Sequence, residues 1–394
     1  MLDNFLFFLK RFIPKPVFEF FQPFYHWCLA FLAGIIYGLP SRRMKVVGIT
    51  GTSGKTTTCE MLFKIFSEAG FKVAAMDGLY FRILDASEPN LLKMTMPGRF
   101  RAQKFLYETK KAGCDYVFLE VTSEGIKQFR HKFIKFYAAL LTNLSEEHLE
   151  AHGGFENYRA AKGELFKISP IHILNADDQN FDFFDEIPAR EKVIFKASDF
   201  PPHLELKLAG DFNKMNAIAA LAFAKHEGIT YDVSKKALEK IEVLPGRMEF
   251  METGKSFKVL VDYAFLPQTL RKVYETLKPS PLICVLGAAG GGRDRWKRPA
   301  LGDIAAKYCR KVFITNEDPY DEDPLKIMNE VCGTHNFEKI LDRREAIRAA
   351  LKAAGPGDIA VVTGKGAEPW IMGPRGTKIP WDDRKIIREE LAKI

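Results

Sequence analysis

Apolar residues recur along the chain with two different periods, and these periods predict strands and helices in alternation. Short apolar, β-rich runs lie at 45–50, 115–121, 137–142 and 171–175, and again at 258–262, 282–286, 311–315 and 358–363. The segments between them have helical character, and a last helix starts near residue 382. Strands that alternate with helices are typical of parallel sheets covered by helices. We therefore predict an α/β fold.

The chain divides into three parts where this pattern changes. The tripeptide Leu244-Pro245-Gly246 lies between two periodic regions and predicts a linker. We therefore expect an N-terminal arm at 1–43, a first α/β domain with a parallel sheet at 44–243, and a second, Rossmann-like α/β domain at 244–394. A length of 394 residues is sufficient for domains with separate hydrophobic cores.

The predicted arm is apolar and basic. Residues 24–39 form a charge-free run of 16 residues between two prolines, and half of the formal net charge of +8 lies in residues 1–45. A membrane span requires about 20 residues, and no small-residue cleavage site of a signal peptide follows. We expect a helical arm that packs on the body or on a partner, or that makes peripheral contact with an anionic membrane surface, and favour both over a span.

The composition limits the class of protein and the cellular compartment that we expect. A hydrophobic fraction of 47% and a charged fraction of 27% indicate a globular protein. Six scattered cysteines without a CxxC pair argue against a zinc site or a disulfide framework and suit a reducing cytoplasm. We expect small-molecule substrates and no nucleic-acid partner, and a monomer in the cytoplasm.

A glycine-rich loop follows the first predicted strand, with the sequence GITGTSGKTT from residue 48. Its glycines allow backbone N–H groups to approach phosphate oxygens, its lysine adds a positive charge, and the next hydroxyl can bind Mg²⁺. The general phosphate-loop pattern requires its first glycine where Ile49 stands, so the loop is a variant. We predict nucleotide contacts from Gly51, Thr52, Ser53, Gly54, Lys55, Thr56 and Thr57.

Three further polar positions carry candidate chemistry. Glu120 ends a buried strand, where ligands bind in open α/β sheets, and is placed to hold Mg²⁺ against Thr56. His148 lies in an acidic cluster after the next predicted strand, and Lys162 lies on a predicted helix. Taken singly, each also fits a solvent-exposed charge.

The loop variant and these positions occur in an order that resembles the Mur ligase family, ATP-dependent enzymes that join an amino acid to a carboxylate. The loop matches the family's G-[IV]-T-G-T-x-G-K-T. Other stretches that resemble family motifs are 120–124, 142–150, 158–162, 175–178, 210–216, 245–249, 261–264, 293–299 and 364–368. Departures include Thr122 and Glu124 in E-V-S-S-H, and Glu147 and Glu150 in T-N-L-x-x-D-H-L-D. The later motifs are most similar to the UDP-N-acetylmuramoyl-tripeptide synthetase branch, which adds the third peptide residue.

The resemblance implies ATP and Mg²⁺ as cofactors, an acyl-phosphate intermediate, and a cell-wall precursor and an amino acid as substrates. It implies that Lys162 is carbamylated and holds the metal ion with Thr56, Glu120 and His148, while Lys55 completes the catalytic set. It adds nucleotide contacts from Asn213, Asn216, Arg247 and Asp262. The implied substrate contacts are Thr95, Thr122, Ser123, Arg130, Arg293, Asp318, Tyr320, Gly364 and Glu368.

The segment expected to select the amino acid departs from the family pattern. Diaminopimelate-adding members carry T-x-D-N-P-R, whose arginine can grip the distal carboxylate of the substrate. Here the arginine position is Tyr320, which has no positive charge, and Glu317 and Asp318 add negative charge. We therefore expect that diaminopimelate is not preferred and that a basic amino acid such as lysine suits the site better.

The start of the chain departs as well. Family members usually carry an N-terminal uridine-binding domain, whereas 47 residues precede Gly48 here. We expect either that the arm replaces this domain or that the acceptor is not a UDP-sugar. Thr95-Met96-Pro97 resembles the family's muramoyl-peptide-binding T-T-P and favours a related acceptor. The alternatives are a folylpolyglutamate-synthase-like ligase, a non-catalytic nucleotide-binding scaffold and a P-loop switch GTPase.

Overall fold

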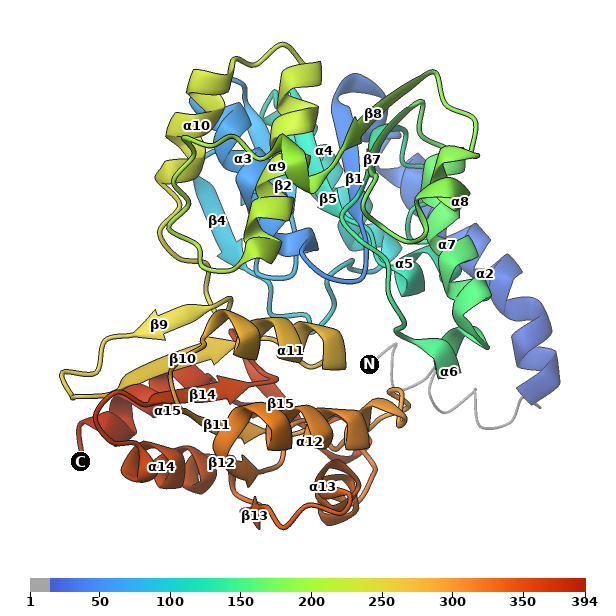
Figure 1. Cartoon of the computed structure of the whole chain (residues 1–394). Coiled ribbons are helices and arrows are strands. Elements are labelled where there is room, and N and C mark those ends of the chain that lie inside the picture. The colour runs from blue at the N-terminus through green and yellow to red at the C-terminus, as the bar shows by residue number, and fades with distance from the viewer. Residues whose placement is uncertain (1–14) are drawn as a thin grey trace.

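The computed structural model describes residues 15–394. Two α/β halves lie one above the other in Figure 1, and helix α2 (Lys15–Ile36) runs beside the first of them. We call residues 45–241 the first half and residues 249–394 the second half. A single 3₁₀ turn, η1 (Pro40–Arg43), joins α2 to the first strand.

The first half is built on an eight-stranded sheet in the order β4-β3-β2-β5-β1-β6-β7-β8. Six neighbouring strands of this sheet pair in parallel, in the order β2-β5-β1-β6-β7-β8. The hairpin of β3 and β4 extends the sheet beyond β2, and its strands pair in antiparallel fashion. The strands are β1 (Lys45–Thr50), β2 (Val73–Met76), β3 (Tyr80–Ile83), β4 (Ala86–Pro89), β5 (Tyr116–Glu120), β6 (Phe136–Leu141), β7 (Ile171–Asn175) and β8 (Glu191–Phe195). The helices are α3 (Lys55–Glu68), α4 (Arg99–Lys111), α5 (Ser123–Lys127), α6 (Leu149–His152), α7 (Phe155–Lys167), α8 (Phe181–Asp185), η2 (Ala197–Asp199), α9 (Asp211–His226) and α10 (Tyr231–Glu239).

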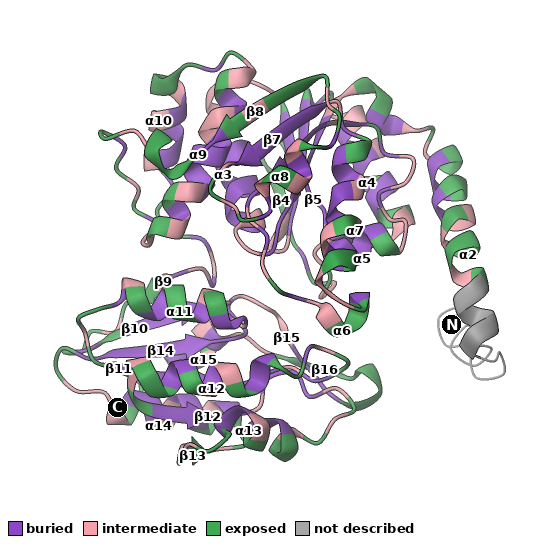
Figure 2. Ribbon diagram, turned by 45° about the vertical axis from the view of Figure 1, so that its right-hand side comes forward, coloured by how far each residue is buried: buried purple, intermediate pink, exposed green. Residues whose placement is uncertain are grey.

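Both faces of the central strands of this sheet are buried, because helices cover each face (Figure 2). Val47 and Ile49 of β1 point into a core shared with α3, α9 and α10, whereas Val46 points into a second core with α4 and α7. Alternate side chains of one strand therefore enter different cores. This is why the central strands appear in the sequence as unbroken apolar runs.

The second half repeats this arrangement on a six-stranded sheet in the order β13-β12-β11-β14-β10-β9, in which only the β10-β9 pairing is antiparallel among the described strands. A small hairpin, β15-β16, stands apart from it. The strands are β9 (Glu249–Met251), β10 (Lys258–Asp262), β11 (Leu282–Leu286), β12 (Cys309–Ile314), β13 (Glu338–Lys339), β14 (Ile359–Thr363), β15 (Trp370–Met372) and β16 (Lys378–Pro380). The helices are α11 (Pro267–Thr276), α12 (Lys297–Tyr308), α13 (Pro324–Cys332), α14 (Arg343–Ala353), η3 (Pro374–Gly376) and α15 (Asp383–Leu391).

The predicted α/β fold is confirmed. All eight predicted strands are present, and α15 begins beside the predicted start of the last helix. The sequence missed mainly edge strands: every residue of β4 is exposed, and β8 is largely exposed. Such strands lack the apolar run that identifies a buried one. The predicted linker lies in the loop between α10 and β9, and the domain boundaries themselves stay a prediction.

The scattered cysteines argue against a disulfide framework, yet one pair of them is bonded in the structure. Cys284 on β11 and Cys309 on β12 form a disulfide, with their Cα atoms 6.1 Å apart. The two strands are neighbours in the sheet, so pairing brings together residues that are 25 positions apart in the sequence. The other four cysteines, Cys28, Cys59, Cys114 and Cys332, are free.

The described part of the arm is the helix α2. It packs against α4 and against Phe133, whose ring lies 5.6 Å from Trp27 and 5.5 Å from Phe31 between centroids. Much of its outer surface is exposed (Figure 2). Among the described helices, none is both long enough and apolar enough to cross a bilayer. Residues 1–14, which complete the predicted arm, lie outside the described part of the chain.

Candidate active site

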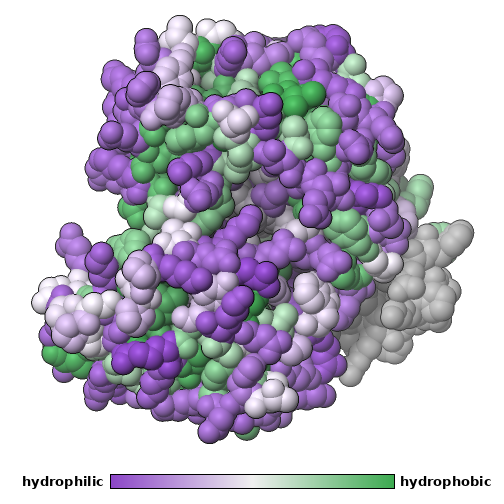
Figure 3. All heavy atoms as spheres, in the orientation of Figure 1, coloured by the Kyte–Doolittle hydropathy of each residue, from purple (hydrophilic) through white to green (hydrophobic). Residues whose placement is uncertain are grey.

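A cavity of about 1750 Å³ lies between the two halves, and both contribute to its lining. Figure 3 shows a largely hydrophilic face that is hollowed where the halves meet. Every residue that the sequence placed at the site, from Gly51 in the phosphate loop to Glu368 near the end of the chain, lines this cavity. The structure therefore brings the predicted set together, while the role of each member stays a prediction.

The phosphate loop requires glycine at two positions. Gly51 has a φ of 144°, and a Cβ atom there would lie 2.0 Å from the hydroxyl of Thr142. Gly54 has a φ of 81°, and a Cβ atom there would lie 2.2 Å from the side-chain oxygen of Asn216. A side chain at either position would clash and would strain the backbone. The loop is thus a cradle of backbone N–H groups at the N-terminus of α3, as phosphate binding requires.

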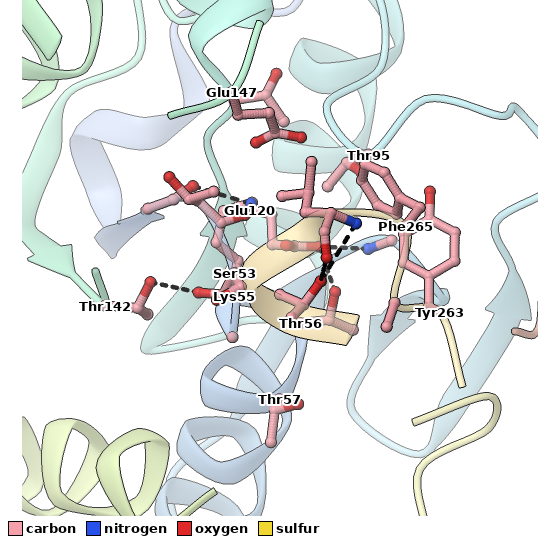
Figure 4. A pocket seen from close by; sticks show the side chains of 18 of the residues that line it. Ser53, Lys55, Thr56, Thr57, Thr95, Glu120, Thr142, Glu147, Tyr263 and Phe265 are labelled. Atoms are coloured by element: carbon pink, nitrogen blue, oxygen red, sulfur yellow. Dashed lines mark hydrogen bonds between the residues drawn. The ribbon is translucent and has the colours of Figure 1, made fainter. Parts of the chain in front are cut away.

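The segment after β6 holds the loop in place. The side-chain oxygen of Asn143 accepts hydrogen bonds from the backbone N and the hydroxyl of Ser53, both at 3.1 Å, and Thr142 donates to the Ser53 carbonyl at 2.7 Å (Figure 4). The hydroxyl of Thr52 contacts the Tyr158 hydroxyl at 3.1 Å. Residues that the sequence connected only as a family motif therefore fix the shape of the cradle.

Two lysines meet at one carbonyl of the loop. Lys55 donates to the carbonyls of Gly51 and Thr52 at 3.0 and 2.9 Å, and Lys162 of α7 donates to the Gly51 carbonyl at 2.8 Å. Burial, with the nearby charge of Lys55, holds the pKa of Lys162 well below its usual value. Lys162 is therefore poised to lose its proton, unlike a lysine on an exposed helix face.

Thr56 and Glu120 form the best-defined candidate metal position. The Thr56 hydroxyl donates to Glu120 Oε2 at 3.0 Å, and the backbone N of Gly78 donates to the same oxygen at 2.6 Å. A hydroxyl and a carboxylate side by side are oxygen ligands of the kind that Mg²⁺ prefers. Burial and the charge of Glu120 raise the pKa of the adjacent Asp77 to about 7. Asp77 was not among the predicted site residues.

His148 contacts a different acid. Its Nε2 lies 3.4 Å from Glu147, a buried carboxylate that the sequence registered only as a departure from a family motif. Burial opposes ionisation of Glu147, but the charges of His148, Lys55 and Lys162 outweigh it and lower the pKa of Glu147. Burial lowers the pKa of His148. Within the described residues, no three His, Cys, Asp or Glu side chains are grouped to hold a metal ion by themselves.

The linker packs tightly against the second half. Asp262 accepts hydrogen bonds from the backbone N of Met248 and of Ala264, both at 2.7 Å, so it fixes the chain around Arg247. The Arg247 guanidinium stacks 4.3 Å from the ring centre of Tyr263. Figure 4 shows Tyr263 and Phe265 approaching the phosphate loop. Gly246 has a φ of 62°, and a Cβ atom there would lie 2.2 Å from the backbone N of Ala367.

Four of the predicted substrate contacts lie in or near the segments around α5 and line the same cavity. Thr122 accepts a hydrogen bond from the backbone N of Gly125 at 3.0 Å and so caps α5, and Arg130 donates to the carbonyl of Met96. Ser123 lies 3.2 Å from Nε2 of His152, a buried histidine that the sequence did not single out. Thr95 also lines the cavity.

Asp318 and Glu368, which the sequence predicted as substrate contacts, form a buried ionic cluster with two lysines. Lys365 of the second half donates to both oxygens of Asp318 at 2.9 and 3.0 Å and to Glu368 at 2.8 Å. Lys93 of the first half donates to Asp318 at 2.7 Å and also to Glu368. Tyr263 donates to the other oxygen of Glu368 at 2.8 Å. The sequence named neither lysine as a site residue.

Comparison with known proteins identifies the architecture. Residues 49–200 match the Mur ligase middle domain, and residues 246–366 match the Mur ligase, glutamate ligase domain. The UDP-N-acetylmuramoyl-L-alanyl-D-glutamate–2,6-diaminopimelate ligase of Syntrophomonas wolfei is 37% identical over 401 residues, covering 92% of this chain and 81% of that protein. The UDP-N-acetylmuramyl-tripeptide synthetase of Roseiflexus sp. is 35% identical, covering 93% and 82%.

Comparison with solved structures also finds ligases of similar fold. A 2,6-diaminopimelate ligase of the same name is 29% identical with a TM-score of 0.58, covering 89% of this chain and 78% of that one. The folylpolyglutamate synthase of Mycobacterium tuberculosis has a TM-score of 0.72 at 15% identity, covering 86% and 92%, and shows likeness of fold alone. The chain therefore belongs to the Mur ligase family, whose members are ATP-dependent, ADP-forming ligases.

Proposed function

We propose that this protein uses ATP to join an amino acid to the free carboxylate of a UDP-N-acetylmuramoyl-peptide-like precursor in cell-wall synthesis. The observation that carries the proposal is the shared cavity in which the phosphate loop faces Arg293, Asp318 and Glu368 of the second half. The names of the similar ligases and tripeptide synthetase support this acceptor. We place the reaction in the cytoplasm and propose that the protein acts as a monomer.

The residues support a two-step reaction. The acceptor carboxylate would attack the γ-phosphorus of ATP and release ADP, and the amine of the amino acid would then displace phosphate from the acyl phosphate. Lys55 is placed to neutralise charge on the transferred phosphoryl oxygens. Mg²⁺ at Thr56 and Glu120 would supply further charge neutralisation. Asn213 and Asn216 lie beside the loop to contact the nucleotide, and the enclosing halves would keep water from the acyl phosphate.

We propose further that Lys162 is carbamylated. Its lowered pKa favours the free amine, the form that adds CO₂ with loss of one proton to give a carbamate anion. The product would turn a cation beside the loop into an oxygen ligand for the metal ion, with His148 nearby. Protein equilibrated with ¹³C-bicarbonate should show a carbamate signal by ¹³C NMR that Lys162→Met abolishes. Lys167→Met on the same helix, at an exposed position, should keep the signal; an unchanged spectrum in the Lys162 variant would refute the assignment.

ATP-dependent ligation is the primary test. Phosphate release should require ATP, Mg²⁺, an amino acid and UDP-N-acetylmuramoyl-L-alanyl-D-glutamate together, and Lys55→Met should abolish it. A folate monoglutamate acceptor tests the second candidate function, which the likeness of fold to folylpolyglutamate synthase keeps in view. Release that is independent of any amino acid would contradict both ligase functions.

We propose that α2 brings the enzyme to an anionic membrane surface. Its exposed side chains are apolar, including Phe24 at 67% and Ile36 at 59% exposed, and no charged residue interrupts residues 20–41. The exposed Arg42 and Arg43 follow directly. Apolar side chains flanked by basic ones are typical of helices that lie in a membrane interface.

Sedimentation with vesicles tests this contact. The wild type should bind vesicles of phosphatidylcholine and phosphatidylglycerol, and bind less to phosphatidylcholine alone. Replacement of the exposed Phe24, Ile35 and Ile36 by serine should abolish binding. Serine at the exposed Ile194 and Leu341, which lie elsewhere on the surface, is the matched control. Equal binding by both variants would rule out α2 as the contact.

A further inference from the structure

The loop between β4 and α4 reaches from the first half to the second and places Lys93 against two carboxylates. Trp370 of the second half donates its indole N–H to the Leu91 carbonyl of this loop at 3.1 Å. The Asn90 side chain bonds the Asp77 and Met94 carbonyls at 2.8 and 3.1 Å, so the loop has a defined shape. Lys93 sits at its tip with a φ of 57°. The hydrogen bonds of the loop therefore fix the position of Lys93, which is not a flexible surface lysine.

The charges at the tip are balanced without any ligand. Two carboxylates, Asp318 and Glu368, face two ammonium groups, those of Lys93 and Lys365. The side chain of Lys93 is only 9% exposed and that of Lys365 is fully buried. Asp318 also accepts from the backbone N of Met372 at 2.8 Å. The oxygens of both acids are thus already in use.

The third acid of this region, Glu317, is buried and already faces cations of its own. Burial, with the neighbouring charge of Asp318, raises the pKa of Glu317. Arg343, Lys365 and Lys297 face it from other elements. A further ammonium group brought to Asp318 and Glu368 by a substrate would compete with the two lysines for oxygens that are already paired, and a buried charge that loses its partner is strongly unfavourable.

We propose that Lys93 is a specificity-determining residue: its ammonium group occupies the cation position at Asp318 and Glu368, so that the enzyme selects amino acids without a second amino group. This inference rests on the proposed ligase function. It differs from the expectation drawn from the sequence, in which the acidic residues favour lysine, because that expectation lacked the two lysines that neutralise them. Removal of the Lys93 charge turns the two carboxylates into a site for a side-chain ammonium group.

Amino-acid selectivity tests the proposal. We would measure ligation by wild type and Lys93→Met with L-alanine, L-serine, L-lysine, L-ornithine and diaminopimelate. The wild type should prefer the amino acids with one amino group. Lys93→Met should shift the ratio of kcat/KM for lysine over alanine at least tenfold towards lysine, mainly through the KM for lysine. Lys93→Arg, which keeps the charge, should keep the wild-type preference, and Lys104→Met at an exposed site on α4 should change nothing.

Binding without turnover separates this proposal from the proposed function. Calorimetry with L-lysine and with 1,5-diaminopentane should detect binding to Lys93→Met and not to the wild type, whether or not ligation occurs. A wild type that prefers diamino acids would overturn the inference, because Lys93 would then be displaced by the substrate. Unchanged selectivity and binding in Lys93→Met would also overturn it. Absence of ligation in every variant, together with the gain in binding, would reject the proposed function and leave the cation site standing.

Discussion

The Thr56 hydroxyl donates a 3.0 Å hydrogen bond to Glu120 Oε2, and so joins the start of α3 to the end of β5. The two strands before these residues, β1 and β5, are neighbours in the parallel sheet. Their carboxyl ends therefore deliver a hydroxyl and a carboxylate to one point, as expected for ligand sites in open α/β sheets.

Glu120→Gln should lower ligase activity by about 10- to 100-fold and raise the Mg²⁺ concentration needed for half-maximal rate. The amide keeps the shape of the side chain but removes the negative charge that the metal ion requires. Steady-state rates over a Mg²⁺ titration measure the effect. Glu156→Gln, at an exposed position on α7, is the control and should match the wild type. An unchanged Mg²⁺ dependence in Glu120→Gln would argue against a metal ion here.

Gly54→Ala and Gly70→Ala form a matched pair. Both positions have φ above 80°, so each substitution should cost about 1–2 kcal/mol of stability. A Cβ atom at Gly54 would meet Asn216 at 2.2 Å, whereas one at Gly70 meets nothing within 4 Å. Only Gly54→Ala should therefore also lose ATP affinity. Urea unfolding and binding of a fluorescent ATP analogue separate the two effects, and equal ATP affinity in both variants would contradict the cradle geometry.

Glu147→Gln should destabilise the protein by about 3 kcal/mol and reduce activity, because the buried charge of Lys297 loses a carboxylate partner. Glu147→Asp keeps the charge and restores the residue of the family motif, so it should retain most activity. Urea unfolding and initial rates would measure both variants. Wild-type behaviour of the glutamine variant would mean that Glu147 does not stabilise Lys297.

The raised pKa of Asp77 predicts that the stability of the protein depends on pH. Its pKa is about 7 in the folded protein against an ordinary value of 3.8, so between these values the folded protein holds a proton that the unfolded chain has lost. Its contribution therefore makes the free energy of unfolding fall as pH rises through this window. Asp77→Asn should flatten the fall between about pH 4 and pH 7, whereas Asp85→Asn on the β3-β4 turn should not. Parallel pH profiles for the wild type and Asp77→Asn would contradict the shift.

The sequence allowed prediction of those features that a local pattern of residues encodes. The buried strands and the phosphate loop are recognisable because unbroken apolar runs and closely spaced glycines are uncommon outside such structures. The position of Lys93 could not be predicted, because its partners lie 225 and 275 residues further along the chain and nothing local distinguishes it from a surface lysine. The partners of Glu147 are likewise brought together only by folding. Long-range charge pairing is the part of this site that requires a structure.

The close packing of Gly246 against residues 366 and 367 sets how the second half can swing. If the second half rotates about the linker, the axis of rotation would pass near this backbone contact, beside Glu368. Groups near this contact, such as Tyr263, would move little, whereas α12, which lies further from the linker in Figure 1, would move more. Opening of the cavity would therefore admit substrates at the α12 end and leave the wall beside the linker almost stationary.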